Sequence, residues 1–202
     1  MLNVYSRFLK AYHFIWHIIF LQSRYKYESR KLAIYGAGIT TGKTSKTFDP
    51  TGMVTRAQMA VFVKRALDYK QNEKSTGQVQ EVLNLVNKER AKAGVSPLSL
   101  ASDVTNVAQV KAEDMMDNNY FSHTSPKYGD PFEMLNHFGI HWTAAGENIA
   151  AGQTTPESVM ASWMASTGHR ENILNPDFKE IGIGFTKGGT YRYYWVQTFI
   201  KR

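Results

Sequence analysis

Residues 180–200 read EIGIGFTKGGTYRYYWVQTFI, and this stretch decides the fold. Three apolar residues alternate with Gly182 and Gly184, and a period of two is typical of a β-strand. A glycine-rich turn at 187–190 then leads into a second predicted strand at 191–200. The stretch therefore predicts an antiparallel hairpin.

The second strand carries bulky side chains on both of its faces. One face holds Tyr191, Tyr193, Trp195 and Phe199, and the other holds Tyr194, Val196 and Ile200. A strand that is apolar on both faces must be covered on both sides by other elements. We therefore expect an α/β fold, a three-layer α-β-α sandwich with a central antiparallel sheet.

Four helices are predicted before the hairpin, because apolar residues recur there at helical spacing. The first has a cap at 75–76 and is closed by Gly94, and the second covers about 101–118. The third and fourth begin with Asp-Pro at 130–131 and Thr-Pro at 155–156. These helices would supply the two outer layers.

Charge is spread unevenly along the 202 residues. Residues 1–76 carry 13 Lys and Arg against 4 Asp and Glu, whereas residues 77–202 carry 11 against 13. The C-terminal part has no basic cluster with stacking aromatics, so we expect no nucleic-acid binding. The chain has no cysteine, which excludes disulfides and thiol catalysis but leaves the compartment open.

The N-terminal part divides into short segments. Residues 1–30 pair basic residues with an apolar run but lack a small-residue cleavage site, and they remain unassigned. Residues 31–69 are rich in glycine turns and end in a predicted helix that reaches about Tyr69. Residues 70–77, KQNEKSTG, are polar and are predicted to be a linker before the domain at 78–202.

The stretch GITTGKTSKTFDPTGMVTRAQMAVFVKRALD at 38–68 resembles part of an S-layer homology (SLH) module. The resemblance implies anchoring to a cell-wall polysaccharide in a Gram-positive bacterium, with Arg56 contacting an acidic sugar. An arginine at a helix N-terminus can bind an anion, because its donors and the helix dipole act together. The module's first helix is not recognisable, so a linker that no longer binds is the alternative.

Three polar segments stand out in the C-terminal domain. They are FSHTSP at 121–126, AGENIA at 145–150 and STGHRENIL at 166–174, and we expect each to place an ionisable group at the end of an element. Together and in this order, they resemble the CAP superfamily in its bacterial SCP-like branch. The resemblance covers nearly all of 78–201.

The resemblance implies a polar cavity that many members line with two histidines and two glutamates. The matching positions are His123, Glu147 and His169, and Ser166 takes the place of the second glutamate. Glu157 and Glu171 lie nearby in the sequence. We expect the cavity residues to converge within one cleft.

Two imidazoles and a carboxylate suit zinc or another divalent metal, with His123, His169 and Glu147 as ligands. A metal-assisted hydrolase is one alternative. A serine hydrolase, using Ser122, Ser125 or Ser166 with a histidine base, is another. The residues could also simply form a hydrogen-bonded network that joins three loops.

The favoured hypothesis is a secreted or cell-wall-associated binding module with a metal-binding cavity. Its expected partners are a wall polysaccharide, through the partial SLH module, and a protein or a lipid-like ligand. A secreted hydrolase of peptide or wall polymer is the first rival. A lipid or sterol binding protein, which the family resemblance also suggests, is the second.

Overall fold

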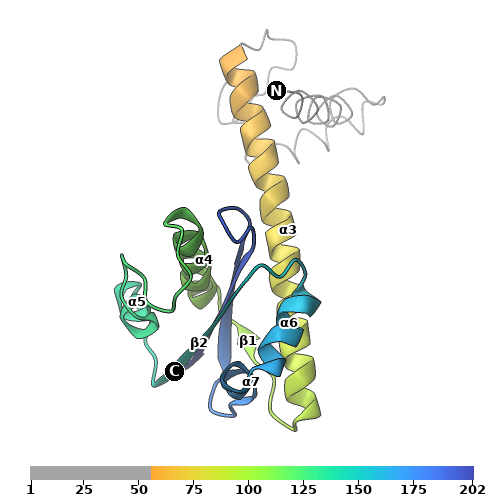
Figure 1. Cartoon of the computed structure of the whole chain (residues 1–202), viewed down its shortest axis with the longest axis vertical. Coiled ribbons are helices and arrows are strands. Elements are labelled where there is room, and N and C mark those ends of the chain that lie inside the picture. Colours follow the sequence, from red (N-terminus) through yellow and green to blue (C-terminus); the bar gives the residue numbers. More distant parts are fainter. Residues whose placement is uncertain (1–55) are drawn as a thin grey trace, which may run out of the picture. The chain divides into compact units, whose positions relative to one another are not determined.

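A computed structural model describes residues 56–202, with side chains for 59–67 and 75–202 (Figure 1). The unassigned N-terminal segment and most of the SLH-like segment lie outside the described residues. The chain divides between Glu73 and Lys74 into two units, and the second contains the sheet. The domain bounds 31–69, 70–77 and 78–202 stay a prediction. From residue 56 onward, the helices are all too short or too polar to cross a membrane.

Helix α3 (Arg56–Lys92) is continuous where the sequence predicted a break in the helix. Its 37 residues run without interruption through 70–77, where a polar break and a new helix cap were predicted. Lys, Gln and Glu in that segment are good helix formers, and a single interior glycine costs only about 1 kcal/mol relative to alanine. Ser75 does not cap a helix, because its hydroxyl donates to the carbonyl of Phe185 at 3.2 Å. As predicted, the helix closes at Gly94, which has a φ of 70°.

The sheet has four strands in the order β1-β3-β4-β2. The predicted hairpin is confirmed as β3 (Glu180–Thr186) and β4 (Tyr194–Lys201), which pair antiparallel with Ile183 opposite Gln197. Strand β4 starts later than predicted, because Arg192 has a left-handed φ of 68° and still belongs to the turn. Two strands were not predicted, β1 (Ser99–Leu100) and β2 (Ala144–Ala151).

Strand β2 pairs antiparallel with β4 and forms one edge of the sheet. Helix α4 (Ser102–Asp117) covers one face of the sheet, with α5 (Pro131–His137) beside it. The C-terminal part of α3 covers the other face together with α6 (Pro156–Ala165) and α7 (Thr167–Leu174) (Figure 1). The three-layer sandwich is thus confirmed.

Both faces of β4 are buried, as the sequence predicted. Trp195 and Phe199 pack with residues of α3, α6 and α7, whereas Tyr194, Val196 and Ile200 pack on the side of α4. The predicted caps of α5 and α6 are also present, as capping boxes at Asp130 and Thr155 followed by proline. The local signals at these helix starts therefore agree with the tertiary fold.

Gly182 and Gly184 set the distance between α4 and the sheet. A Cβ atom on Gly182 would lie 2.3 Å from the carbonyl oxygen of Val104, and one on Gly184 would lie 2.1 Å from that of Ala108. Both contacts are with helix backbone, which cannot rotate away as a side chain can. Helix α4 therefore packs directly on the backbone of β3.

Replacing Gly184 with alanine tests this contact. We expect Gly184→Ala to lower the free energy of unfolding by about 1–3 kcal/mol, because the added methyl forces α4 away from the sheet. Gly77→Ala is the matched control, since a Cβ there meets nothing within 4 Å inside the continuous helix. That variant should be more stable than the wild type by about 0.5–1 kcal/mol. Urea denaturation of the full chain measures the free energy of unfolding of both variants. A Gly184→Ala variant as stable as the wild type would contradict the direct packing of α4 on β3.

Candidate functional site

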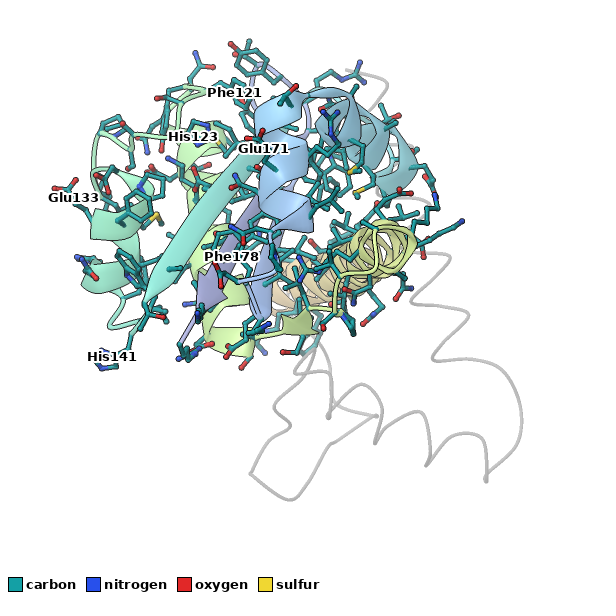
Figure 2. The ribbon with its side chains drawn as sticks, turned by 90° about the horizontal axis from the view of Figure 1, so that it is seen from below. Phe121, His123, Glu133, His141, Glu171 and Phe178 are labelled. Carbon is teal, nitrogen blue, oxygen red and sulfur yellow. The ribbon has the colours of Figure 1, made fainter. Side chains whose placement is uncertain are left out.

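The predicted site residues come from three elements around strand β2. His123 lies in the loop between α4 and α5, and His169 lies in the first turn of α7. Glu147 is in the middle of β2, opposite Thr198 of β4. The expectation that all three lie at element ends is therefore wrong for Glu147. Figure 2 shows His123 on one side of β2, with α7, marked by Glu171, on the other.

Successive side chains of β2 point to opposite faces of the sheet, so this one strand contacts elements on both faces. Ile149 packs among residues of α4, so Glu147, two positions earlier, also faces α4. Asn148 points the opposite way, and its side-chain amide donates to the backbone carbonyl of His169 at 3.0 Å. Glu147 and Asn148 therefore connect the edge strand to elements on opposite faces of the sheet.

The side chains of His123 and Glu147 are in direct contact. The Nδ1 atom of His123 lies 2.8 Å from Oε1 of Glu147. The Glu147 side chain is only 4% exposed, whereas that of His123 is 51% exposed. A buried carboxylate thus holds one nitrogen of an accessible imidazole. Among the described residues, no hydrogen bond involves its other nitrogen, Nε2.

His169 is the second imidazole of the site. Burial lowers its pKa below the ordinary histidine value, and the charge of the nearby His123 lowers it further. His169 therefore keeps a neutral ring, with a free lone pair, to a lower pH than an exposed histidine does. The two histidines are close enough to influence each other electrostatically.

A network of side-chain amides fixes α7 against β2. The amide of Asn172 donates to Oδ1 of Asn148 at 2.9 Å and to the carbonyl of Glu147 at 3.3 Å. Asn148 also donates to Oε1 of Gln197 at 3.0 Å, and both of these side chains are fully buried. Sequence reasoning missed these asparagines, although Asn148 and Asn172 lie inside the motifs that carried the CAP resemblance.

Ser166 separates α6 from α7, as the C-cap of one and the N-cap of the other. Its side chain makes no capping hydrogen bond to α7. Glu157 and Glu171 are both exposed. Among the residues whose side chains are described, neither glutamate belongs to a group of three side chains that could hold a metal ion. Arg56 is the first residue of α3, and its side chain lies outside the described side chains.

A buried polar layer lies beneath the His123 loop and was not predicted. Lys111 of α4 is only 1% exposed, and its ammonium donates to the backbone carbonyl of His123 at 2.6 Å. Asp114, one helical turn later, accepts from the hydroxyls of Tyr120 and Ser125. Burial and the bond to Asp114 raise the pKa of Tyr120, which therefore stays a neutral phenol. Lys111 interrupts the apolar stripe of α4, a signal that could have revealed this layer.

Two of the three serines proposed as nucleophiles, Ser122 and Ser125, take part in hydrogen bonds within the His123 loop. Ser125 is buried, donates to Oδ2 of Asp114 at 2.7 Å, and accepts from the backbone amides of Lys127 and Tyr128. The hydroxyl of Ser122 accepts from the backbone amide of Thr124. These bonds give both serines a structural role within the loop.

The donor set fits a metal only in part. Among the side chains that the structure describes, at 59–67 and 75–202, no three His, Cys, Asp or Glu are grouped so that they could hold a metal ion. Because Glu147 already bonds to Nδ1 of His123, the geometry favours this carboxylate as the group that orients the ring. The donors that then remain are the two imidazoles.

Family models match both parts of the chain. The model of the cysteine-rich secretory protein (CAP) family matches residues 83–199, and that of the S-layer homology domain matches residues 32–60. Both resemblances inferred from the sequence are thereby confirmed. The SLH match is confined to a short segment.

Two proteins of Bacillus subtilis (strain 168) are similar in sequence. The uncharacterized protein YkwD is 50% identical over 121 residues, which is 60% of this chain and 46% of YkwD. The uncharacterized membrane protein YlbC is 35% identical over 153 residues, which is 76% of this chain and 42% of YlbC. The chain thus spans less than half the length of these relatives.

Solved structures share the fold. An extracellular protein containing a SCP domain from Bacillus anthracis is 30% identical with a TM-score of 0.58, over 75% of this chain and 45% of that one. An outer surface protein of Borrelia burgdorferi has the same TM-score at 21% identity, over 62% of this chain and 93% of that one. With a family match over more than half of its length and a sandwich of the same fold, this cysteine-free chain belongs to the cysteine-rich secretory protein (CAP) family.

Proposed function

We propose that this protein is a cell-surface-associated CAP protein whose C-terminal domain is a binding module, and that His123 and His169 bind a divalent metal. The cell-surface part rests on the SLH match and on the similarity to an extracellular SCP-domain protein. The binding part rests on the geometry around strand β2.

The contact between His123 and Glu147 is the observation that carries the proposal. In metal sites, a ligating histidine commonly gives its second ring N–H to a carboxylate, which fixes the tautomer and the orientation of the ring. The 2.8 Å contact between Nδ1 and the buried Glu147 has this form. It directs the lone pair of Nε2 away from the protein core.

His169 would supply the second nitrogen, because Asn148, the residue after Glu147, bonds to its backbone carbonyl at 3.0 Å and its lowered pKa keeps the ring neutral. Two imidazoles suit zinc, and waters or a bound ligand would complete the coordination. Two protein donors predict weak binding. A bound zinc would act as a Lewis acid toward an oxygen of a ligand.

The same geometry favours binding over serine hydrolysis. Ser125 is buried and bonded to Asp114, and the hydroxyl of Ser122 accepts from the backbone amide of Thr124. A serine nucleophile needs a histidine base within hydrogen-bond reach, and none of the hydrogen bonds of the described residues joins Ser122, Ser125 or Ser166 to a histidine ring. We therefore expect zinc binding without turnover of peptide or wall polymer.

The N-terminal segment suggests a wall polymer as a partner. The SLH match at 32–60 includes Arg56, the residue expected to contact an acidic sugar. A wall-bound N-terminus would hold the CAP domain at the cell surface.

Zinc titration by calorimetry tests the site. His123→Ala and His169→Ala should each abolish binding, because each removes one of two nitrogen donors. Glu147→Gln should weaken binding about 10–100-fold, the usual effect of losing a group that orients a ligating ring. His141→Ala is the control, since this exposed histidine lies apart from His123 in Figure 2. Unchanged zinc affinity in His169→Ala would contradict the proposal, and turnover lost in that variant would favour the hydrolase.

Acid should release the metal, because a protonated imidazole has no lone pair to donate. We expect zinc binding to weaken as the pH falls through about 6.5, the ordinary histidine range. In metal-free protein followed by NMR, His169 should titrate below that range, because burial and the charge of His123 both oppose its protonation. His123→Ala should raise the pKa of His169, since it removes one of these causes. A His169 pKa at or above the ordinary value would contradict this account of the site.

A further inference from the structure

Lys111 is a charged residue in the protein interior with no role in the site as described so far. Its side chain is only 1% exposed, on the face of α4 that packs against the sheet. Burying an ammonium is costly unless hydrogen bonds and opposite charges compensate it. The contacts of Lys111 therefore indicate what the residue does.

The strongest contact of Lys111 is with the loop that carries His123. Its Nζ donates to the backbone carbonyl of His123 at 2.6 Å, a short bond of the charge-assisted kind. The hydroxyl of Tyr120 lies at 3.5 Å, and the ring centroid of Tyr120 lies at 5.3 Å. The carboxylates of Glu147 and Asp114 interact favourably with the ammonium and oppose the effect of burial on its pKa.

Asp114 holds the same loop at two other points. It accepts from the hydroxyl of Tyr120, before His123, and from the hydroxyl of Ser125, after it. Two residues of α4, three positions apart, thus fix the loop at its start, its middle and its end. Lys111 makes the middle contact, with the backbone carbonyl of His123.

We propose that Lys111 is a positioning residue for the site: by holding the carbonyl of His123, it places Nδ1 of that imidazole against Glu147 and leaves Nε2 for the ligand. The inference rests on the proposed function only in taking Nε2 as the ligand atom. The positioning itself is a property of the metal-free protein. It follows from the 2.6 Å and 2.8 Å contacts on either side of His123.

The tautomer of His123 is the readout that distinguishes positioning from general support of the fold. A neutral ring bonded to a carboxylate through Nδ1 carries its proton on Nδ1. Once released from Glu147, the ring is free to adopt the Nε2–H tautomer that predominates in water. Nitrogen-15 NMR of the metal-free full chain, at a pH where the ring is neutral, separates the two forms.

Lys111→Met removes the donor and keeps an aliphatic side chain of similar length. Lys111→Gln keeps a polar end on a shorter chain that does not reach the carbonyl, and it serves if the first variant does not fold. The matched control is Lys179→Met, which removes an exposed lysine that also donates to a backbone carbonyl, that of Pro176 at 2.9 Å. Urea denaturation establishes that each protein compared is folded.

We expect the Nδ1–H tautomer of His123 in the wild type and in Lys179→Met, and mainly Nε2–H in the folded Lys111 variants. The zinc affinity of the Lys111 variants should fall about 10-fold or more. Removing a nearby positive charge would by itself strengthen cation binding, so weaker binding indicates misplacement of the ring. A folded Lys111 variant that keeps the Nδ1–H tautomer would overturn the inference, as would a wild-type His123 in the Nε2–H form. If the wild type binds no zinc but the Lys111 variants still change the tautomer of His123, the metal proposal fails and the positioning role of Lys111 stands.

Discussion

The direct contact between α4 and strand β3 is the constraint on which the rest of the domain depends. Side chains are absent at Gly182 and Gly184, so the helix backbone approaches the strand more closely than any other residue pair would permit. Because packed interiors resist small displacements, this contact fixes the distance of α4 from the sheet and its rotation about its own axis. Lys111 and Asp114 then lie beneath the loop at 120–125, and His123 reaches Glu147 on the edge strand.

The opposite face of the sheet is held by a second buried cation. Arg90 of α3 is fully buried and donates to the carbonyls of Ile173 at 2.7 Å and Asn175 at 2.9 Å, at the C-terminal end of α7. It also donates to Ser96 at 2.7 Å and Phe178 at 3.3 Å, so one guanidinium joins four backbone carbonyls. With α7 fixed in this way, its amide contacts to β2 bring His169 to the same strand that carries Glu147. A site at a sheet edge thus obtains order from both neighbouring layers.

Much of the fold could be predicted from local signals, and the misses share a physical cause. The N-terminal caps of α5 and α6 and the two apolar faces of β4 are encoded in short segments, and all were predicted. Strand β2 was missed because AAGENIAA lacks bulky alternating residues, and its strand geometry comes from pairing with β4. Helix α7 was not predicted as a separate helix, because its sequence has little helical periodicity. The break expected at 70–77 is absent, because the helical segments on either side continue through it. At the candidate site, the family motif predicted the histidines and Glu147. The interrupted apolar stripe of α4 was the only sequence signal for Lys111, and it did not indicate that Lys111 bonds to the carbonyl of His123.

A crystal structure of the full chain soaked with zinc, with data collected at the zinc absorption edge, tests the central claim most directly. The account predicts one anomalous peak between His123 and His169, about 2.0–2.1 Å from Nε2 of His123 and from a ring nitrogen of His169. Glu147 should remain bonded to Nδ1 of His123 and stay outside the coordination sphere. A zinc ion bound by Glu147 in place of His123 would contradict this account. So would the absence of a peak near these histidines in a crystal that takes up zinc elsewhere.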